Sequence, residues 1–376
     1  MGAIIAPMRP VEGWDEVGAR VREARLSLCL SQAELGRRLH LDRTMVAKIE
    51  AGTRQLDALE LFRLSDALEL PINHFLYRPP EAIVSRRMAL TEDTDNDVSR
   101  DSYRLEAQLT AWLRDIEQLV GLGVLDVAAP TGLVLTASDT QSAQESAGRV
   151  RRWLKLGPEP LGSIVSVCER LGLLVLVSEL PGDGACVQWN SIGAAVVSHR
   201  GDPGRRRATA AHELGHFLLG DEYSSDIGVH ASRAQREQII DSFAAELLVP
   251  RASLAATWPR EHVDKATTRA HAVRQSARYR VSWSLLLRQL ENAQLIDSKL
   301  HLAWRNNPPT RAELLDAAGW EPRPDLELGQ VPPCFAHGVL LAWRRRHISA
   351  SRAVELLRGR VGVEDLPPRD DEVEVP

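Results

Sequence analysis

The chain has 376 residues, of which 44% are hydrophobic and 26% are charged. These proportions are ordinary for a globular protein and exclude a largely disordered, low-complexity or collagen-like chain. The formal net charge of −5 disfavours a protein that coats nucleic acid through an overall positive charge, although it is compatible with a local basic surface.

Two sequence features concern the cellular compartment. No run approaches the roughly 18 apolar residues of a membrane-spanning helix, and the first residues lack the basic start of a secretory signal. The four cysteines are far apart and form no Cys-x-x-Cys pair, so neither a disulfide framework nor a zinc ribbon is expected. We therefore expect a cytoplasmic protein that does not contact a membrane.

Helical patterning predominates, and shifts in composition divide the chain, so we expect a mainly α, multidomain protein. In chain order, the expected segments are an N-terminal tail at 1–13, a helical module at 14–78, a linker at 79–104, a connecting helix and loop at 105–145, an α+β domain at 146–258, a helical subdomain at 259–305, and a C-terminal extension with an acidic tail at 306–376.

The module between Trp14 and Tyr77 is predicted to form five short helices. Ser31 and Glu34 have the spacing of a capping box at the start of the second helix, and Asp42 precedes the third. Two short helices joined by a tight turn can place the second of them in the major groove of DNA. A plain helical bundle used for dimerisation is the alternative interpretation.

The residues that we expect to contact DNA lie on or beside the second and third of these helices: Gln32, Arg38, Arg43, Thr44, Lys48 and Arg54. Residues 36–54 hold five basic and two acidic side chains, so positive charge is concentrated there. The stretch LSQAELGRRLHLDRTMVAKIEAGTRQLDALELFRLSDALELPINHFL resembles the XRE, or lambda-repressor-like, helix-turn-helix family. This resemblance implies binding to double-stranded operator DNA as a homodimer. His40 stands where the family's turn usually has glycine, so we expect a less tight turn.

The segment 146–258 is predicted to combine helices with a small three-stranded sheet. Residues 173–178 form a short apolar run typical of a buried strand, and two more strands are expected at 185–188 and 193–198. The helix pair that follows, within 262–302, has a helix-turn-helix-like pattern. We favour a packing role for it over DNA contact.

A buried helix is predicted around Ala210–Leu219, and it contains the pattern His-Glu-x-x-His at His212, Glu213 and His216. Residues four apart lie on one face of a helix, so both imidazoles can bind one metal ion. Glu213 is turned by about 100° from His212, where it can act as general base toward water that the metal activates. A surface helix with two stray histidines is the alternative.

A catalytic zinc needs a third protein ligand, and the candidates are Glu222, His230, Glu237 and Glu246. We prefer Glu237, because it shares a stripe of the next predicted helix with Asp241. Asp241 could accept a hydrogen bond from the far nitrogen of a ligating histidine. Glu246 lies about 180° from Glu237 and is expected to be solvated. Zinc suits these ligands, although manganese or iron could occupy them.

The stretches GRRRATAAHELGHFLLGD and REQIIDSFAAELLVP resemble the ImmA/IrrE family of metallopeptidases, and the resemblance covers residues 145–255. It implies a zincin-like fold and a gluzincin-like zinc endopeptidase, with the Glu237 and Asp241 positions matching the family pattern. Ile240 and Ser198 depart from the residues usual at their positions. For stabilising the oxyanion, Tyr223, His230 and His271 are conceivable, and the sequence does not choose among them.

The two modules on one chain predict a regulator. The family resembles stress or mobile-element switches in which the peptidase cuts a helix-turn-helix repressor. Our first hypothesis is a DNA-binding transcriptional regulator whose zinc-dependent endopeptidase cleaves such a repressor or the chain itself. The second is a non-enzymatic, antitoxin-like repressor that uses the peptidase fold for sensing or partner binding. The third is a peptidase whose helix-turn-helix only docks its substrate.

Overall fold

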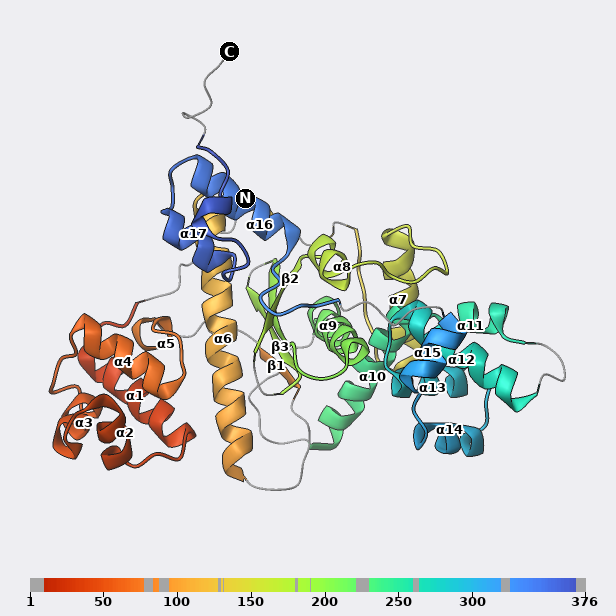
Figure 1. Cartoon of the computed structure of the whole chain (residues 1–376), viewed down its shortest axis with the longest axis horizontal. Helices are drawn as coiled ribbons and strands as arrows, with labels where there is room; N and C mark the ends of the chain where they lie inside the picture. Colours follow the sequence, from red (N-terminus) through yellow and green to blue (C-terminus); the bar gives the residue numbers. More distant parts are fainter. Residues whose placement is uncertain are drawn as a thin grey trace, which may run out of the picture.

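The computed structural model describes residues 10–77, 84–87, 95–127, 130, 132–179, 182–189, 191–220, 230–259, 264–318 and 325–369. These residues form a mainly helical protein around one small sheet (Figure 1). Within the described part of the chain, no helix is long and apolar enough to cross a membrane. The acidic tail expected at 370–374 lies outside the described residues.

The N-terminal module has the five predicted helices: α1 (Trp14–Ser27), α2 (Gln32–Leu39), α3 (Arg43–Glu50), α4 (Ala58–Leu68) and α5 (Asn73–Leu76). Ser31 and Glu34 form the predicted capping box, in which the Glu34 amide donates to Ser31 Oγ at 3.2 Å. His40 adopts the left-handed conformation with a φ of 56°, and Leu41 N donates to the Gly36 carbonyl at 2.8 Å. The turn between α2 and α3 therefore closes without glycine, and the looser turn that we expected is absent.

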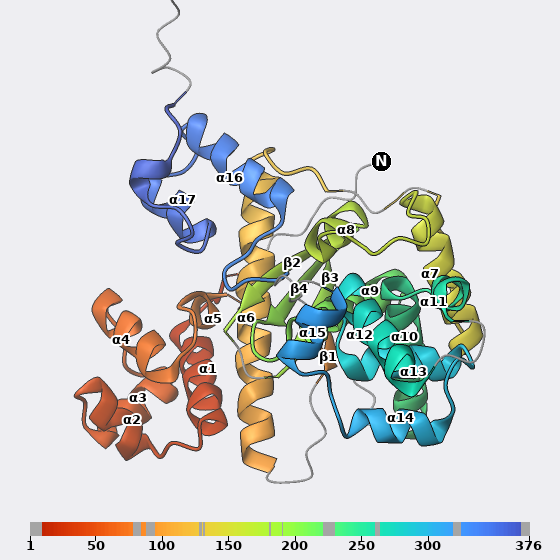
Figure 2. The ribbon, with the colours of Figure 1, turned by 45° about the vertical axis from the view of Figure 1, so that its right-hand side comes forward.

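Helix α6 (Asp95–Gly121) begins within the stretch that the sequence assigns to the linker, and it lies between the N-terminal module and the sheet (Figures 1 and 2). Toward the module, Tyr103 Oη lies 2.6 Å from His74 Nε2, and Arg104 forms an ion pair with Glu69 at 2.6 Å. Toward the sheet, the buried Trp112 donates its indole N–H to the Leu174 carbonyl at 2.9 Å. One helix therefore contributes to two cores.

The sheet contains the three predicted strands, β2 (Leu173–Ser178), β3 (Gly184–Trp189) and β4 (Ile192–Ser198). Strand β4 lies in the middle, parallel to β2 and antiparallel to β3. A fourth strand, β1 (Val84–Arg87), comes from the expected linker and pairs antiparallel with the outer edge of β3, which gives the order β1-β3-β4-β2.

Alternation along the strands divides the sheet into two buried faces. On β2, Leu174 and Leu176 face the core that contains α6, whereas Leu173, Val175 and Val177 face a second core, which is covered by helices. Two helices lie directly on the second of these faces: α8 (Ile164–Arg170) contacts β2, and α9 (Pro203–Leu218) contacts all three central strands. Beyond α9, further helices pack on one another: α7 (Thr140–Trp153), α10 (His230–Leu248), α11 (Arg251–Thr257), α12 (Lys265–Tyr279), α13 (Trp283–Asn292), α14 (Ser298–Arg305) and α15 (Arg311–Ala318).

The helix pair α12 and α13 belongs to this packed layer. Leu286 and Leu287 of α13 are fully buried in the core that also contains α9 and α10. Ser282 caps α13, because its hydroxyl accepts a hydrogen bond from Leu285 N at 3.4 Å. The packing role that we favoured for this pair agrees with these contacts.

The C-terminal extension completes the core around α6. It contains α16 (Pro333–Arg344), α17 (Ala350–Leu356) and the short 3-10 helix η1 (Val363–Asp365). Phe335 packs against Trp112 with ring centroids 4.5 Å apart, and Asp115 of α6 pairs with Arg352 and Arg358, each at 2.6 Å. The extension thus fixes the position of α6 on the sheet.

Candidate metal centre

Helix α9 carries the His-Glu-x-x-His pattern against the sheet. It begins with Pro203 after an Asp202 cap, whose carboxylate accepts from Arg205 N at 3.1 Å. His212, Glu213 and His216 are all buried. Residues 212 and 216 share one face, as their spacing requires, and that face meets α10.

Three side chains from α9 and α10 converge at this meeting point. The two Nε2 atoms of His212 and His216 are 3.0 Å apart, and Glu237 Oε2 lies 3.1 Å from His212 Nε2 and 3.8 Å from His216 Nε2. Glu237 is 27% exposed, so the cluster is reachable from solvent. The structure therefore brings together the three residues that the sequence nominates as metal ligands.

The spacing of these atoms fits a zinc ion. Zinc lies about 2.0–2.1 Å from its nitrogen and oxygen ligands, and tetrahedral geometry then places two ligand atoms about 3.3 Å apart. The observed separations of 3.0, 3.1 and 3.8 Å bracket this value. Two imidazoles and one carboxylate are also a protein ligand set of catalytic zinc sites, in which water or substrate takes the fourth position.

Asp241 holds the His212 ring in this orientation. The two residues meet through His212 Nδ1 and Asp241 Oδ1 at 2.9 Å, which leaves Nε2 directed toward Glu237. Burial lowers the pKa of His212, but its hydrogen bonds to Asp241 and Glu237 outweigh burial, and the pKa is raised. Arg288 of α13 lies 3.7 Å from the other oxygen of Asp241. The sequence analysis missed Arg288, because nothing near it in the chain links it to α10.

Glu213 is the exceptional residue of the site. Its side chain is fully buried, yet neither carboxylate oxygen has a hydrogen-bond partner among the described residues. A buried carboxylate without partners is costly, so its presence calls for a ligand or a chemical role. A Cβ atom added at Gly184 would lie 3.4 Å from Glu213 Oε1 and 2.8 Å from Thr209 Cγ2. Glycine at the start of β3 therefore permits its close approach to this carboxylate.

The remaining candidates lie elsewhere. Glu222 and Tyr223 are outside the described residues, as is the side chain of His230. Glu246 is not solvated as expected, because it is only 14% exposed and accepts hydrogen bonds from Arg251 and Gln289. His271 packs edge-on against Trp258 and lies 3.1 Å from Gln275 Nε2, in a separate cluster.

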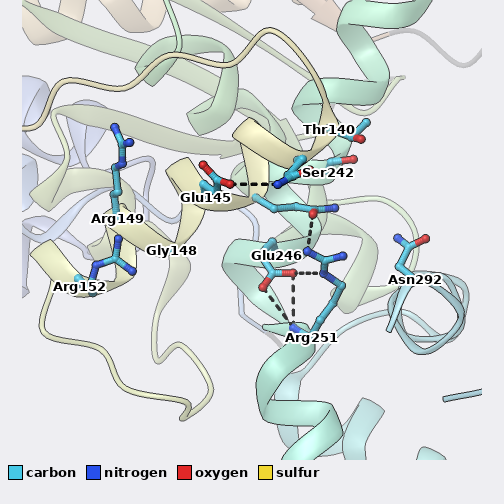
Figure 3. A pocket seen from close by; sticks show the side chains of 11 residues that line it. Thr140, Glu145, Gly148, Arg149, Arg152, Ser242, Glu246, Arg251 and Asn292 are labelled. Atoms are coloured by element: carbon cyan, nitrogen blue, oxygen red, sulfur yellow. Dashed lines mark hydrogen bonds and ion pairs between the residues drawn. The ribbon is translucent and has the colours of Figure 1, made fainter. Parts of the chain in front are cut away.

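A polar groove runs along α10 beside the centre. Its larger part, about 930 Å³, lies between α7, α10 and the end of α13, and it is lined by Arg149, Arg152 and Arg251 among others (Figure 3). A smaller hollow of about 390 Å³ shares Thr140, Ser242 and Asn292 with it and includes Asp241 and Arg288. The groove thus begins at the residue that orients His212.

The predicted DNA-contacting residues fall into two groups. Arg43, Thr44 and Lys48 are exposed on α3. The other three make contacts within the module: Gln32 donates to Glu50 at 2.9 Å, Arg38 donates to the Ala67 carbonyl at 3.0 Å, and Arg54 pairs with Glu60 at 2.5 Å. Arg43 and Lys48 of α3 therefore present basic groups to solvent, as does Arg38, which is exposed despite its hydrogen bond.

Comparisons with known proteins agree with this two-part organisation. Residues 21–75 match the helix-turn-helix family model, and residues 168–291 match the model of the IrrE N-terminal-like domain of the M78 peptidases. A stretch of 59 residues is 37% identical to an uncharacterized transcriptional regulator in the ATPase CF(0) region of Rhodospirillum rubrum. That match covers 16% of this chain and 55% of the relative, so the chain spans about half the relative's length.

Among solved structures, Bacillus thuringiensis PlcR in complex with the peptide PapR7 and DNA aligns over 91% of both chains. The sequence identity is 12% and the TM-score is 0.17, so this alignment carries no argument about fold or function.

Proposed function

Because the chain joins an XRE-type helix-turn-helix domain to an IrrE-like domain of the M78 peptidase family, we propose that it is a DNA-binding transcriptional regulator with zinc-dependent endopeptidase activity. The proposed peptidase activity rests chiefly on the environment of Glu213. Its buried carboxylate has no partner in the described structure and follows directly on His212, one of three converging ligands. A domain used only for binding has no need of such a carboxylate.

His212, His216 and Glu237 would hold the zinc ion, which polarises the scissile carbonyl and lowers the pKa of water when it is bound. Glu213 then accepts the proton of the attacking water and passes it to the leaving amine. Asp241 maintains the orientation of His212 throughout this cycle. Neither oxygen of Glu213 accepts a hydrogen bond from the residues that the structure describes, so both are available as proton acceptors.

The proposed substrate is a helix-turn-helix repressor or the chain itself, and the proposed context is a stress or mobile-element switch. The DNA-binding module would bind its operator as a homodimer through α3. Direct packing of this module on α6, which also lies on the sheet, supports a joint role for the two parts. Cleavage of a DNA-binding protein would then change transcription at the bound operator.

The experiment uses the purified full chain loaded with zinc, beside the variant Glu213→Gln. Mass spectrometry follows fragments of the chain itself and of candidate repressors. We expect cleavage by the wild type and a loss of about 10²- to 10⁴-fold in the variant, with the metal retained. Wild-type cleavage by the variant would refute the role of Glu213. Bound metal without cleavage of any candidate would favour the non-enzymatic regulator.

A further inference from the structure

The outer edge of β3 is occupied by a strand from a distant part of the chain. The register pairs Val84 with Val187, Ser85 with Cys186, Arg86 with Ala185, and Arg87 with Gly184. Without β1, this edge would present unpaired backbone N–H and C=O groups, which are a template for any extended peptide (Figure 1). The edge is therefore a strand-binding surface, and the chain's own segment covers it.

This edge lies beside the general base of the proposed site. At Gly184, which is opposite Arg87, β3 comes close to Glu213 and Thr209, since an added Cβ atom would lie 3.4 Å from Glu213 Oε1 and 2.8 Å from Thr209 Cγ2. Two residues further along β3, the Cys186 thiol donates to the Glu213 carbonyl at 3.5 Å. A peptide paired with β3 would thus pass next to the buried carboxylate that has no partner in the described structure.

The connection between the two parts does not need this pairing. Tyr77 already lies against α6, because the Arg114 guanidinium is 3.5 Å from the centroid of its ring. Arg114 is about 28 Å along α6 from its start at Asp95. The chain between Tyr77 and Asp95 can reach about 60 Å when extended, so it has spare length to leave the sheet. Release of β1 requires no separation of the module from α6.

We propose that the outer edge of β3 is a binding site for an extended peptide substrate, and that Val84–Arg87 occupies it as an intramolecular competitor. The inference rests on the proposed peptidase function and adds its regulation. A substrate strand and β1 require the same backbone groups of β3, so they bind one at a time. A substrate must therefore displace the linker strand before it binds, so the linker slows cleavage by the resting chain without abolishing it.

The first test asks whether β1 occupies this edge in solution. The register places Ser85 directly opposite Cys186, and opposite positions in an antiparallel pair are within reach of a disulfide. The full chain with Ser85→Cys, in a background where the exposed Cys29 is replaced by Ser, is treated with a mild oxidant and mapped by mass spectrometry. We expect a crosslink to Cys186, and none in the control Arg86→Cys, which the register places opposite Ala185. Equal crosslinking in both, or none in either, overturns the pairing.

The second test asks whether an external peptide competes. A fluorescein-labelled peptide with the sequence of residues 81–90, EAIVSRRMAL, is titrated against the full chain by anisotropy. All proteins carry Glu213→Gln, so that no peptide is cut. In an edge strand, only every second backbone N–H points toward the paired strand, and proline has no N–H. The double variant Ser85→Pro and Arg86→Pro therefore removes one N–H that pairs with β3, whichever of the two residues donates it. If this variant does not fold, Gly-Ser-Gly-Ser in place of residues 84–87 serves instead.

We expect the released variant to bind the peptide at least tenfold more tightly than the chain with an intact linker, and the crosslinked chain not to bind it. Equal binding by all forms, or no binding by the released variant, would overturn the inference. The results also distinguish a failure of this inference from a failure of the proposed peptidase function. If only the peptidase function fails, the released variant still binds the peptide. If only the inference fails, chains that keep Glu213 cleave equally fast with the intact linker and with the Ser85→Pro and Arg86→Pro linker.

Discussion

His212 Nδ1 lies 2.9 Å from Asp241 Oδ1, and this contact directs the opposite nitrogen of the same ring to within 3.1 Å of Glu237. One carboxylate of α10 therefore orients a histidine of α9, while a second carboxylate, one turn earlier, completes the ligand set. The contact links two helices that are separated by a stretch outside the described residues. It makes the ligand geometry depend on how α10 packs on α9.

Replacement of Asp241 by Asn tests this dependence. The Asp241 carboxylate accepts the Nδ1–H of His212 and makes Nε2 a stronger metal ligand, which an amide does less well. We therefore expect a 10- to 100-fold loss of zinc affinity with the fold retained. Affinity is measured by competition with a chromophoric chelator. Ser242→Ala, the next residue on α10, is the matched control and should bind zinc as the wild type does. Unchanged affinity in Asp241→Asn would show that the hydrogen bond does not position His212.

Two basic residues on the exposed face of α3 are expected to bind DNA. Arg43→Ala and Lys48→Ala should each weaken operator binding, and each lost phosphate contact should reduce the slope of log affinity against log salt by about 1. Electrophoretic or anisotropy titrations over a range of salt concentrations measure both quantities. Arg152→Ala, an exposed arginine on α7, is the control and should leave them unchanged. A normal salt slope in both α3 variants would contradict this assignment.

His40 carries backbone strain that glycine would relieve. Its φ of 56° lies in the left-handed region, which a residue with a Cβ atom adopts at a cost of about 1–2 kcal/mol. Glycine gains entropy in the unfolded chain, which offsets part of this relief, so His40→Gly should raise the free energy of unfolding by a net value of about 0.5–1 kcal/mol. Denaturant titration measures this change. His40→Ala keeps the strain, and an equal gain in that variant would refute the explanation.

The contact between the N-terminal module and α6 is expected to weaken in acid. Burial, together with the nearby positive charge of Arg20, lowers the pKa of His74 to about 4 from an ordinary value of 6.5. The folded pKa is depressed, so the stability contributed by neutral His74 is complete above pH 6.5 and is lost as the pH falls toward 4. The full loss is about 3 kcal/mol.

Unfolding free energies at pH 7 and pH 4.5 check this expectation in the wild type and in His74→Phe. The variant removes the titrating group, so its stability should fall less between the two pH values. An identical fall in both proteins would show that His74 does not contribute to the acid sensitivity of this interface.

Local spacing predicted much of the site. His212, Glu213 and His216 have fixed positions on a helix, and Glu237 and Asp241 fall one turn apart on the next helix in the described structure. These relations depend only on helical geometry, which the sequence reveals. The three central strands and the five N-terminal helices were predicted for the same reason, from apolar periodicity and capping residues.

Relations between distant segments could not be predicted in this way. Strand β1 has only four residues, and its pairing with β3 depends on how α6 brings the linker to the sheet. Glu246 looked solvated because Gln289, one of its partners, comes from another helix. Arg288 reaches Asp241, and Arg352 and Arg358 reach Asp115, through tertiary packing that leaves no local pattern.

The proposed peptidase function depends on metal binding by His212, His216 and Glu237. Inductively coupled plasma mass spectrometry of the full chain, purified without a metal-affinity tag, measures this beside Glu237→Ala and Glu213→Gln. We predict about one zinc ion per chain in the wild type and in Glu213→Gln, and loss of the metal in Glu237→Ala. A wild type that stays free of metal when zinc is supplied, or a Glu237→Ala variant that keeps a full complement, would contradict the account.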